Sequence, residues 1–460
     1  MPPANLKVLI SGGGIAGLTL AVLLERAGID YQVFELAKTV RPLGTALSIG
    51  PSVMPMIEQL GLLEKFVALA KVNDVVSNFN EELQLTSTVN YMEFLGRTGY
   101  PNYVISRPHL YDLLLSQLPK EKIHMGHRVA TILQGDTEVT VSFTDGTSAT
   151  GHILVGADGA YSGVRKSLYD QLHLAGKLPL SDQEELPCSS VCLVGQTGPL
   201  SADKFPHLKE KYCRFENISG RDKPYTWLTF CMPNNTICWM VIEHLYMETN
   251  RSEMVRSPAW DQGVADAMID KVRLFPIPSG APGLTLADLI DETPRELISH
   301  VALEGKFFET WYAGRTVLIG DACHKMYPSA AQGANVAIQD AIVLSNYLYS
   351  MNDMQPETIT KAFEGYHQER VDSARQAHET SERFRQLFRK RFINTVIRFM
   401  VKFFPQWVWN RVFDKVYSNR PQVAFLPLVE DRGSVKAFPQ RSLHLNEDAL
   451  KVASLAAPAS

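Results

Sequence analysis

A glycine-rich turn near the N-terminus constrains the fold of this chain more than any other feature. An apolar run at residues 8–10 precedes the turn, and a helical pattern covers residues 16–27. The turn matches the pattern GxGxxG through Gly12, Gly14 and Gly17. A buried strand, a tight glycine turn and a helix are the opening of a parallel βαβ unit. The sequence therefore predicts an α/β fold that begins with a parallel sheet.

The three glycines of the turn have separate physical roles in a nucleotide-binding unit. Gly12 permits the tight turn, Gly14 lets a diphosphate approach the backbone, and Gly17 lets the helix pack closely on the strand. The start of the helix then offers unpaired N–H groups and positive potential to the phosphates. Glu35 ends the second predicted strand, where a carboxylate accepts hydrogen bonds from ribose hydroxyls and repels a 2′-phosphate. Together they predict a dinucleotide with an unphosphorylated adenosine ribose.

Two later apolar strands also end in glycine and aspartate. One ends in Asp158-Gly159 and the other in Gly320-Asp321. Either segment alone is an ordinary turn at a strand end, where both residue types are common. Behind a GxGxxG start, the pair indicates that the chain returns to the nucleotide domain after an excursion.

In these features the chain resembles the FAD-dependent class A monooxygenases of the para-hydroxybenzoate hydroxylase type, which include many enzymes of fungal secondary metabolism. The resemblance extends over residues 6–375. It implies an α/β fold in which a Rossmann-type FAD-binding domain is interrupted by an inserted β-rich substrate domain. A helical C-terminus follows.

The resemblance also implies which residues contact FAD. The glycine turn would cradle the diphosphate, Glu35 would hold the adenosine ribose, and Arg107, just before a predicted helix, would contact the cofactor. The predicted cofactor-binding residues are Gly12, Gly14, Ala16, Gly17, Glu35, Gly44, Ala46, Arg107, Asp158, Gly159, Gly320, Asp321, Gly333, Ala334 and Asn335.

NAD(P)H is the second cofactor that the resemblance implies, as a transient co-substrate. The Asp158-Gly159 segment with Arg165 would serve both FAD and NAD(P)H, and Gly320-Asp321 would hold the ribityl and diphosphate region. The chain carries no second Rossmann fingerprint for a nicotinamide dinucleotide. In the resembling family that is normal, because NAD(P)H binds across the FAD domain. The sequence does not distinguish NADH from NADPH.

The turn that opens a helix at residues 333–335 resembles the family's segment beside the flavin. Amides at that helix start would stabilise negative charge on the reduced flavin. Two positions depart from the family's pattern: Ala331 stands where glycine is common, and Gly44-Thr45-Ala46 stands where relatives often read Gly-Ala-Gly. His324, near Asp321, is the one titratable residue beside a flavin motif that suggests a catalytic role, but we expect it to have a structural or supporting role. No catalytic side chain is assigned, because the oxygen chemistry belongs to the flavin.

The resemblance predicts the function of the chain. It would be a monooxygenase that uses NAD(P)H and O2 to hydroxylate or epoxidise a lipophilic aromatic or isoprenoid-type small molecule through a flavin C4a-hydroperoxide. One alternative is an FAD-dependent oxidase, dehydrogenase or halogenase, although residues 225–230 do not match the halogenases' Trp-x-Trp-x-Ile-Pro segment. The other is a non-catalytic escort protein on the same fold, as in proteins that resemble Rab GDP-dissociation inhibitors.

The pattern of strands and helices predicts four parts. These are an FAD-binding domain at 1–75, 101–186 and 285–375, a β-rich substrate domain at 76–100 and 187–284, a basic amphipathic helical region at 376–440, and a flexible tail at 441–460. Aromatic residues in the β-rich part either line a substrate pocket or, as their period-two spacing favours, belong to the core. They are Tyr225, Trp227, Phe230 and Trp239.

Composition excludes several other classes of protein. The formal charge of -4, from 45 basic and 49 acidic residues, does not call for a nucleic acid partner. The six cysteines have no metal-ligand spacing, so we expect reduced core thiols and no metal site. No apolar run reaches the roughly 18 residues of a spanning helix, and the N-terminus shows no secretion signal, so we expect a cytoplasmic protein.

A basic segment at residues 383–415 is the least expected feature. It carries nine Lys or Arg residues and one acid, Asp414, interleaved with aromatic and aliphatic residues. This composition is typical of a helix that lies on an anionic membrane surface, which would make the protein peripheral to an internal membrane. The alternative is a helix docked on the body of the protein with its basic face in water.

Overall fold

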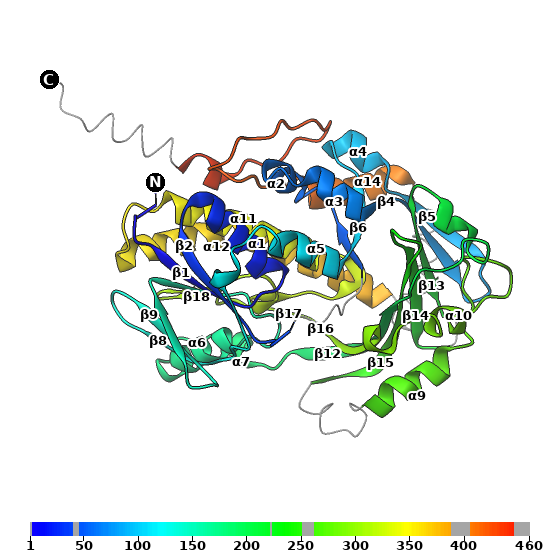
Figure 1. The fold of residues 1–460 in the computed structure, drawn as a ribbon, viewed down its shortest axis with the longest axis horizontal. Coiled ribbons are helices and arrows are strands. Elements are labelled where there is room, and N and C mark those ends of the chain that lie inside the picture. Colours follow the sequence, from blue (N-terminus) through cyan, green and yellow to red (C-terminus); the bar gives the residue numbers. More distant parts are fainter. Residues whose placement is uncertain (1, 40–45, 221–222, 251–261, 388–404, 446–460) are drawn as a thin grey trace.

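The structure is a computed structural model that describes residues 2–39, 46–220, 223–250, 262–387 and 405–445. Figure 1 shows two units side by side. A six-stranded sheet flanked by helices lies on the left, and a larger curved sheet lies on the right. The structure therefore has the α/β architecture with a β-rich second unit that the sequence predicted.

The six-stranded sheet is built around the predicted βαβ unit. Its strand order is β18-β19-β11-β1-β2-β7, and every pair is parallel except β18 with β19. The strands are β1 (Lys7–Ser11), β2 (Asp30–Glu35), β7 (Ile123–Met125), β11 (Ile153–Gly156), β18 (Tyr312–Ala313) and β19 (Thr316–Leu318). The chain crosses from β1 to β2 on one side, and β11 pairs on the other side. Ligands of such sheets bind at this kind of switch point.

The nine-stranded sheet forms the second unit. Its strand order is β16-β12-β15-β14-β13-β4-β6-β3, with β5 paired to β4. The strands are β3 (Ala46–Ile49), β4 (Ala70–Asn80), β5 (Leu85–Asn90), β6 (Asn102–Ser106), β12 (Pro187–Gln196), β13 (Cys213–Ser219), β14 (Tyr225–Cys231), β15 (Ile237–Asn250) and β16 (Ser299–Glu304). Segments far apart in the sequence thus share one sheet.

Helices and smaller sheets complete the described structure. The helices are α1 (Ile15–Ala27), α2 (Met54–Gln59), α3 (Leu63–Leu69), α4 (Glu93–Thr98), α5 (Arg107–Leu115), α6 (Gly163–Leu174), α7 (Leu180–Gln183), α9 (Gln262–Val272), α10 (Ala287–Ile290), α11 (Gly333–Ser350), α12 (Pro356–Leu387) and α14 (Gln406–Tyr417). The smaller sheets comprise β8 (Val129–Gln134), β9 (Val139–Phe143) and β10 (Ser148–Gly151), and the pair β17 (Lys306–Phe307) and β20 (His324–Lys325). No helix among the described residues is long and apolar enough to cross a membrane.

The structure differs from the predicted division of the chain at both ends. The boundary drawn at residue 75 falls inside β4, and β3 and β6, which the division placed in the FAD domain, are strands of the larger sheet. Ser442, predicted to lie in a flexible tail, is buried, and its amide and hydroxyl donate to Glu369 at 2.9 and 3.0 Å. Propensity could not reveal either tertiary contact from the local sequence.

The larger sheet has two faces with different surroundings. Trp227 and Trp239 lie on its outer face, fully buried in a core that includes Met268 of α9 and Leu289 of α10. Phe230 faces the opposite, inner side, where it packs with Val104 of β6. The interpretation of these aromatics as core residues therefore holds for the two tryptophans, and they do not line a pocket.

All six cysteines are buried free thiols. Burial raises the pKa of Cys188 to about 11 and the pKa of Cys238 to about 12. A thiol with so high a pKa stays protonated at neutral pH and reacts slowly. This agrees with the expected reduced core thiols.

Candidate functional site

The carboxyl ends of β1, β11 and β19 meet at one edge of the six-stranded sheet. Gly12 follows β1 with φ of +105°, in the region that favours glycine. A Cβ at Gly12 would lie 2.3 Å from the carbonyl oxygen of Ala157 and 2.7 Å from Cα of Asp158. Only glycine therefore lets the first turn press against the segment that follows β11.

The other two glycines of the turn show opposite surroundings. A Cβ at Gly17 would lie 1.9 Å from the carbonyl oxygen of Gly12, so this position is closed by backbone packing. A Cβ at Gly14 would have no atom of another residue within 4 Å. Gly14 precedes α1, and no side chain caps that helix. The open space at Gly14 thus lies in front of helix amides that can bind phosphate oxygens.

Glu35 lies beside this turn, as its predicted role requires. One carboxylate oxygen accepts a hydrogen bond from the Gly13 amide at 2.7 Å, and the other accepts from the Ala37 amide at 2.8 Å. Each carboxylate oxygen has a second lone pair. Glu35 can therefore fix the turn and still accept hydrogen bonds from ribose hydroxyls.

Asp158 presents one occupied and one unoccupied oxygen. Its Oδ2 accepts from the amides of Gly163 and Val164 at 2.8 and 3.1 Å, which caps α6. Its Oδ1 is buried and has no hydrogen-bond partner among the described residues. Burial raises the pKa of Asp158, although hydrogen bonds from Ser162 and the two amides oppose that rise. An orphaned buried acceptor at the sheet edge fits a polar group of a bound cofactor.

Gly320 brings two helix starts to the same place. It follows β19 with φ of +61°. A Cβ at Gly320 would lie 3.3 Å from Cβ of Ala16 in α1 and 3.1 Å from Cβ of Ala337 in α11. The N-terminal turns of α1 and α11 therefore converge on this residue, and both direct positive potential toward the sheet edge.

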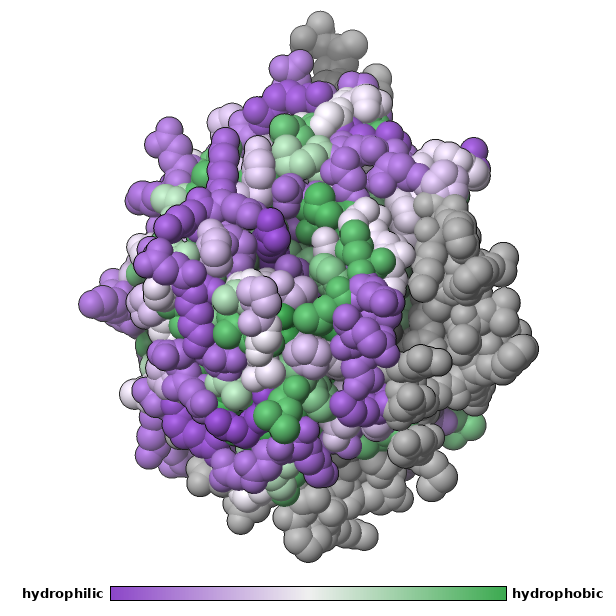
Figure 2. Space-filling view, turned by 90° about the vertical axis from the view of Figure 1, so that its right-hand side faces the viewer, coloured by the Kyte–Doolittle hydropathy of each residue, from purple (hydrophilic) through white to green (hydrophobic). Residues whose placement is uncertain are grey.

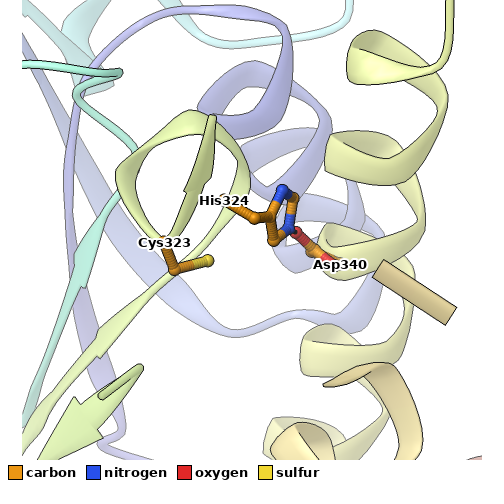
Figure 3. Close-up of side chains that lie close together, drawn as sticks. All are labelled: Cys323, His324 and Asp340. Atoms are coloured by element: carbon orange, nitrogen blue, oxygen red, sulfur yellow. Dashed lines mark hydrogen bonds and ion pairs between the residues drawn. The ribbon is translucent and has the colours of Figure 1, made fainter. Parts of the chain in front are cut away.

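A buried network of hydrogen bonds holds Gly320 in place. The Gly320 amide donates to Oδ2 of Asp340 at 3.0 Å, and Nε2 of His324 lies 2.5 Å from the same oxygen. Nε of Arg370 donates to the other oxygen of Asp340 at 2.9 Å. Figure 3 shows the His324 ring pointing at Asp340 beside Cys323. Burial alone raises the pKa of Asp340, but His324, Arg370 and the Gly320 amide outweigh it and hold that pKa below its usual value.

Cys323, His324 and Asp340 lie close enough together to suggest a metal site. Hydrogen bonds, however, occupy these groups: both Asp340 oxygens accept, and the Cys323 thiol donates to the carbonyls of Leu318 and Gly320 at 3.5 Å. Burial raises the pKa of Cys323 well above its usual value, so the thiolate that a metal needs is disfavoured. These hydrogen bonds hold the loop that contains Gly320, and the supporting role of His324 stays a prediction.

Ala331, which departs from the family's pattern, lies just before α11 in a conformation that favours glycine. This residue has φ of +51°, the left-handed conformation that glycine adopts most readily, and alanine there costs roughly 1 kcal/mol. The side chain of Asn335 forms hydrogen bonds within the protein. Its amide nitrogen donates to the Ser48 carbonyl, and its oxygen accepts from the Gly50 amide, both at 2.9 Å. No side chain caps α11, so its first amides, from Gly333 to Asn335, are available to a cofactor.

Two predicted residues come together across the strand pair β3 and β6. Ala46 pairs with Ser106, so Arg107 lies next to it at the start of α5. The Arg107 side chain is exposed, and Gly159, with φ of +79°, is half-buried. Gly44 lies outside the described residues.

Two charged residues of the predicted set are engaged within the protein. Asp321 pairs with Lys325 at 2.5 Å. The buried guanidinium of Arg165 donates to the carbonyls of Ala322 and Ala160 at 2.8 and 2.6 Å. It also lies over the ring of Phe308. Arg165 therefore joins the loops after β11 and β19, which is a structural use of the residue that the resemblance did not indicate.

Comparisons with known proteins agree with this geometry. A family model described as FAD binding domain matches residues 5–180 and 282–381. FAD-dependent monooxygenase ptmM of Penicillium ochrochloron is 30% identical over 441 residues, which covers 91% of this chain and 94% of that protein. The chain belongs to the FAD-dependent monooxygenases.

Further relatives support the assignment. FAD-dependent monooxygenase atmM of Aspergillus flavus is 32% identical over 358 residues, 75% of this chain and 69% of its own length. The structure of Klebsiella pneumoniae HpxO with FAD and uric acid matches with a TM-score of 0.72 at 20% identity, over 92% of this chain and 97% of that one. The second likeness shows the fold. The monooxygenase is thus a flavoprotein whose cofactor is FAD.

The residues at the sheet edge fit FAD. The open space at Gly14 with the α1 amides suits the diphosphate, and Glu35 suits the ribose of the adenosine. The orphaned Oδ1 of Asp158 and the uncapped start of α11 suit the remaining polar groups. These assignments remain predictions for the individual residues.

Asp340 and Arg370 were not predicted from the sequence. One signal was present: Asp340 is the only charged residue in the helix Gly333–Ser350. A lone carboxylate in a buried helix must be paired, and that requirement could have pointed to a partner.

We expect Asp340→Asn to destabilise the monooxygenase by about 3 kcal/mol, because it leaves the buried Arg370 without its counter-ion. The free energy of unfolding would be measured in urea, with Asp372→Asn on the exposed face of α12 as the matched control. Because the folded-state pKa of Asp340 is lowered, its contribution is complete above about pH 4 and is lost as pH falls through the folded pKa. The gap between wild type and Asp340→Asn should therefore narrow below pH 4. A gap that is small at pH 7, or independent of pH, would contradict the network.

Proposed function

We propose that this monooxygenase uses NAD(P)H and O2 to hydroxylate or epoxidise a lipophilic aromatic or isoprenoid-type small molecule. Bound FAD would supply the redox chemistry, taking electrons from NAD(P)H and activating dioxygen. The observation that supports a lipophilic substrate is the inner face of the nine-stranded sheet. This face carries half-buried apolar side chains, and among the described residues its buried cluster contains no helix residue, whereas α9 and α10 pack on the outer face (Figure 1).

The register of the strands identifies the residues of the inner face. Leu228 of β14 is opposite Met240 of β15, and both alternate with the outward tryptophans. Ile242 and Phe215 lie on the same side and, like the first two, are half-buried. The inner face continues to β3, because the Ala46 amide donates to Sγ of Cys238 at 3.3 Å. Such a wall is suited to an apolar substrate and limits the access of water.

A polar group interrupts this wall on β15. The His244 ring lies 2.9 Å from the Thr226 hydroxyl through Nε2, and its Nδ1 lies 3.4 Å from the Ser190 hydroxyl. Contacts from both ring nitrogens fix the orientation of the imidazole. A few placed polar groups in an apolar pocket orient a ligand, and we propose that role for the Thr226 hydroxyl, which His244 holds in place.

The purified protein tests this function directly. We expect yellow protein with bound FAD whose consumption of NADPH or NADH rises with a matching terpenoid or aromatic compound, and whose product takes one oxygen atom from ¹⁸O₂. The measurements are absorbance at the nicotinamide band, peroxide release, and mass spectrometry of the product. Met240→Trp would fill the inner face and lower kcat/KM for that compound at least ten-fold, whereas Leu133→Trp on the exposed strand β8 would not.

Other outcomes favour the alternatives that the sequence left open. Oxygen consumption with substrate but without nicotinamide would indicate an oxidase. Bound FAD that no nicotinamide reduces, with any compound of the panel, would contradict the monooxygenase. A correctly folded protein without flavin would favour the escort protein.

We also propose a peripheral contact with an anionic membrane surface through residues 383–415. The described part of this segment includes α14, whose outer face exposes Trp407 by 58% and Val412 by 36%, together with Arg411 and Lys415. α14 contacts β5, where Leu85 is exposed. Figure 2 shows apolar residues gathered within a mostly hydrophilic surface on the side of the molecule that carries α4 and β5. Aromatic and basic side chains in this arrangement suit a lipid interface.

One face of α14 packs on the body of the protein, as the alternative interpretation of this segment expected. Phe413 packs on Phe94 with ring centroids 4.8 Å apart, and Asp414 pairs with Arg97. The helix therefore lies on the body of the protein and would meet lipid only with its outer face. Residues 388–404 lie outside the described structure.

Vesicle sedimentation separates the two interpretations. We expect binding to vesicles that contain phosphatidylserine and weaker binding to phosphatidylcholine alone. Replacing both Arg411 and Lys415 by alanine should weaken binding to the anionic vesicles roughly 10- to 30-fold, at about 1 kcal/mol for each charge. Replacing the exposed Lys166 and Lys177, which lie in and just after α6 in the other unit, is the matched control (Figure 1). Equal sedimentation of wild type with either vesicle, or none, would contradict the contact.

A further inference from the structure

The last residue of α14 enters the interior next to the start of α11. Tyr417 is 3% exposed, although it belongs to a segment beyond the residues that the FAD-binding family model matches. Its ring lies 4.8 Å from that of Phe94, measured between centroids. A Cβ at Gly50 would lie 2.6 Å from the Tyr417 ring, so this glycine makes room for the tyrosine.

The hydroxyl of Tyr417 faces the side-chain amides of two buried residues, Gln332 and Asn102. Gln332 is the residue that immediately precedes the first turn of α11. The amide nitrogen of Asn102 is buried and has no hydrogen-bond partner among the described residues, so it lies beside the Tyr417 hydroxyl without bonding it. Burial raises the pKa of Tyr417 and Tyr91 adds to the rise, while the two amides oppose it. The hydroxyl is therefore protonated at neutral pH.

Hydrogen bonds connect Asn102 to the start of α11. Oδ1 of Asn102 accepts from the Ser48 hydroxyl at 3.0 Å, and the Ser48 carbonyl accepts from the Asn335 side chain at 2.9 Å. Asn335 and Gln332 belong to the same helix start. Tyr417 lies against this path at two points: its ring lies beside Gly50, whose amide donates to Asn335, and its hydroxyl lies beside the side chains of Asn102 and Gln332.

The chain beyond Tyr417 is fastened along α11 itself. Gln339 donates to the Asn419 carbonyl and Asn346 donates to the Gln422 carbonyl, both at 2.9 Å. The Ala424 amide donates back to Asn346 at 2.8 Å. Because α11 holds this segment, the position of Tyr417 relative to Gln332 is set by the helix whose start it contacts.

We propose that Tyr417 is a positioning residue of the flavin site, which fixes Gln332 and thereby the first amides of α11. The inference rests on the proposed placement of the flavin at that helix start. Amides aligned there stabilise negative charge on the reduced flavin, so their alignment sets how readily FAD is reduced. The C-terminal helix is then part of the redox site as well as a surface element.

The first test compares Tyr417→Phe with Tyr91→Phe in the FAD-loaded protein. Tyr91 packs in the same aromatic cluster, and its pKa of about 12 reflects burial alone, so its replacement by phenylalanine is a matched control. Removing one hydrogen-bonding hydroxyl should weaken stabilisation of reduced over oxidised flavin about three- to ten-fold. We expect a more negative midpoint potential for Tyr417→Phe, measured against a reference dye, and no change for Tyr91→Phe. Equal potentials in both variants would overturn the proposal.

The second test asks whether the effect passes through Gln332. If it does, Gln332→Ala should shift the potential in the same direction, and the double variant should show no more than the larger single effect. Additive shifts would overturn the proposal. Hydrogen exchange of the Val336 amide in the apoprotein does not depend on flavin. Because this amide donates to the Gln332 carbonyl at 3.0 Å, its exchange should be faster in Tyr417→Phe than in Tyr91→Phe. Wild-type protein that holds no FAD would instead refute the proposed function, so the two failures are distinguishable.

Discussion

Gly320 is held between α1 and α11, and the rest of the site depends on that contact. A Cβ at Gly320 would lie 3.3 Å from Cβ of Ala16 and 3.1 Å from Cβ of Ala337, so any side chain there would push at least one of the two helices away. Its amide is fixed by Asp340, which Arg370 and His324 keep charged in the interior. A buried carboxylate of this kind is costly unless it is paired. The network therefore makes the convergence of two helix starts stable.

The second consequence of the fold is the different use of the two faces of the nine-stranded sheet. The outer face forms a conventional core, in which Trp239 donates to Thr293 at 2.9 Å and packs with α9 and α10. The inner face continues onto β3 and β6 and so lies beside the start of α11. One curved sheet thus provides both a stable second unit and an apolar wall next to the flavin segment. In this arrangement, strands from residues 46–106 and strands from residues 187–304 belong to the same sheet.

Local patterns were sufficient for the parts of the structure that depend on local physics. The turn at Gly12, the strand that ends at Glu35 and the helix that begins at Gly333 all lie where the sequence predicted them, because glycine geometry and apolar periodicity are short-range signals. The face of Trp227 was not predictable, since period two fixes which residues share a side but not which side meets the helices. The roles of Tyr417 and Arg370 depend on contacts with residues far away in the chain, and no local pattern announces them. Arg165 was expected to serve the cofactors, and two of its five N–H donors bind the carbonyls of Ala322 and Ala160, a contact that the sequence did not indicate.

The central prediction is that the open space at Gly14 holds the FAD diphosphate. Gly14 has φ of -75° and no neighbour within 4 Å of a Cβ, so alanine fits there without strain in the protein alone. The most direct measurement is a titration of FAD into apoprotein of Gly14→Ala, beside Gly96→Ala, an equally open position in α4. We predict that both variants fold with the thermal stability of wild type, that Gly96→Ala binds one FAD per chain, and that Gly14→Ala binds at least ten-fold more weakly. Undiminished FAD binding by Gly14→Ala would place the diphosphate elsewhere and contradict the account.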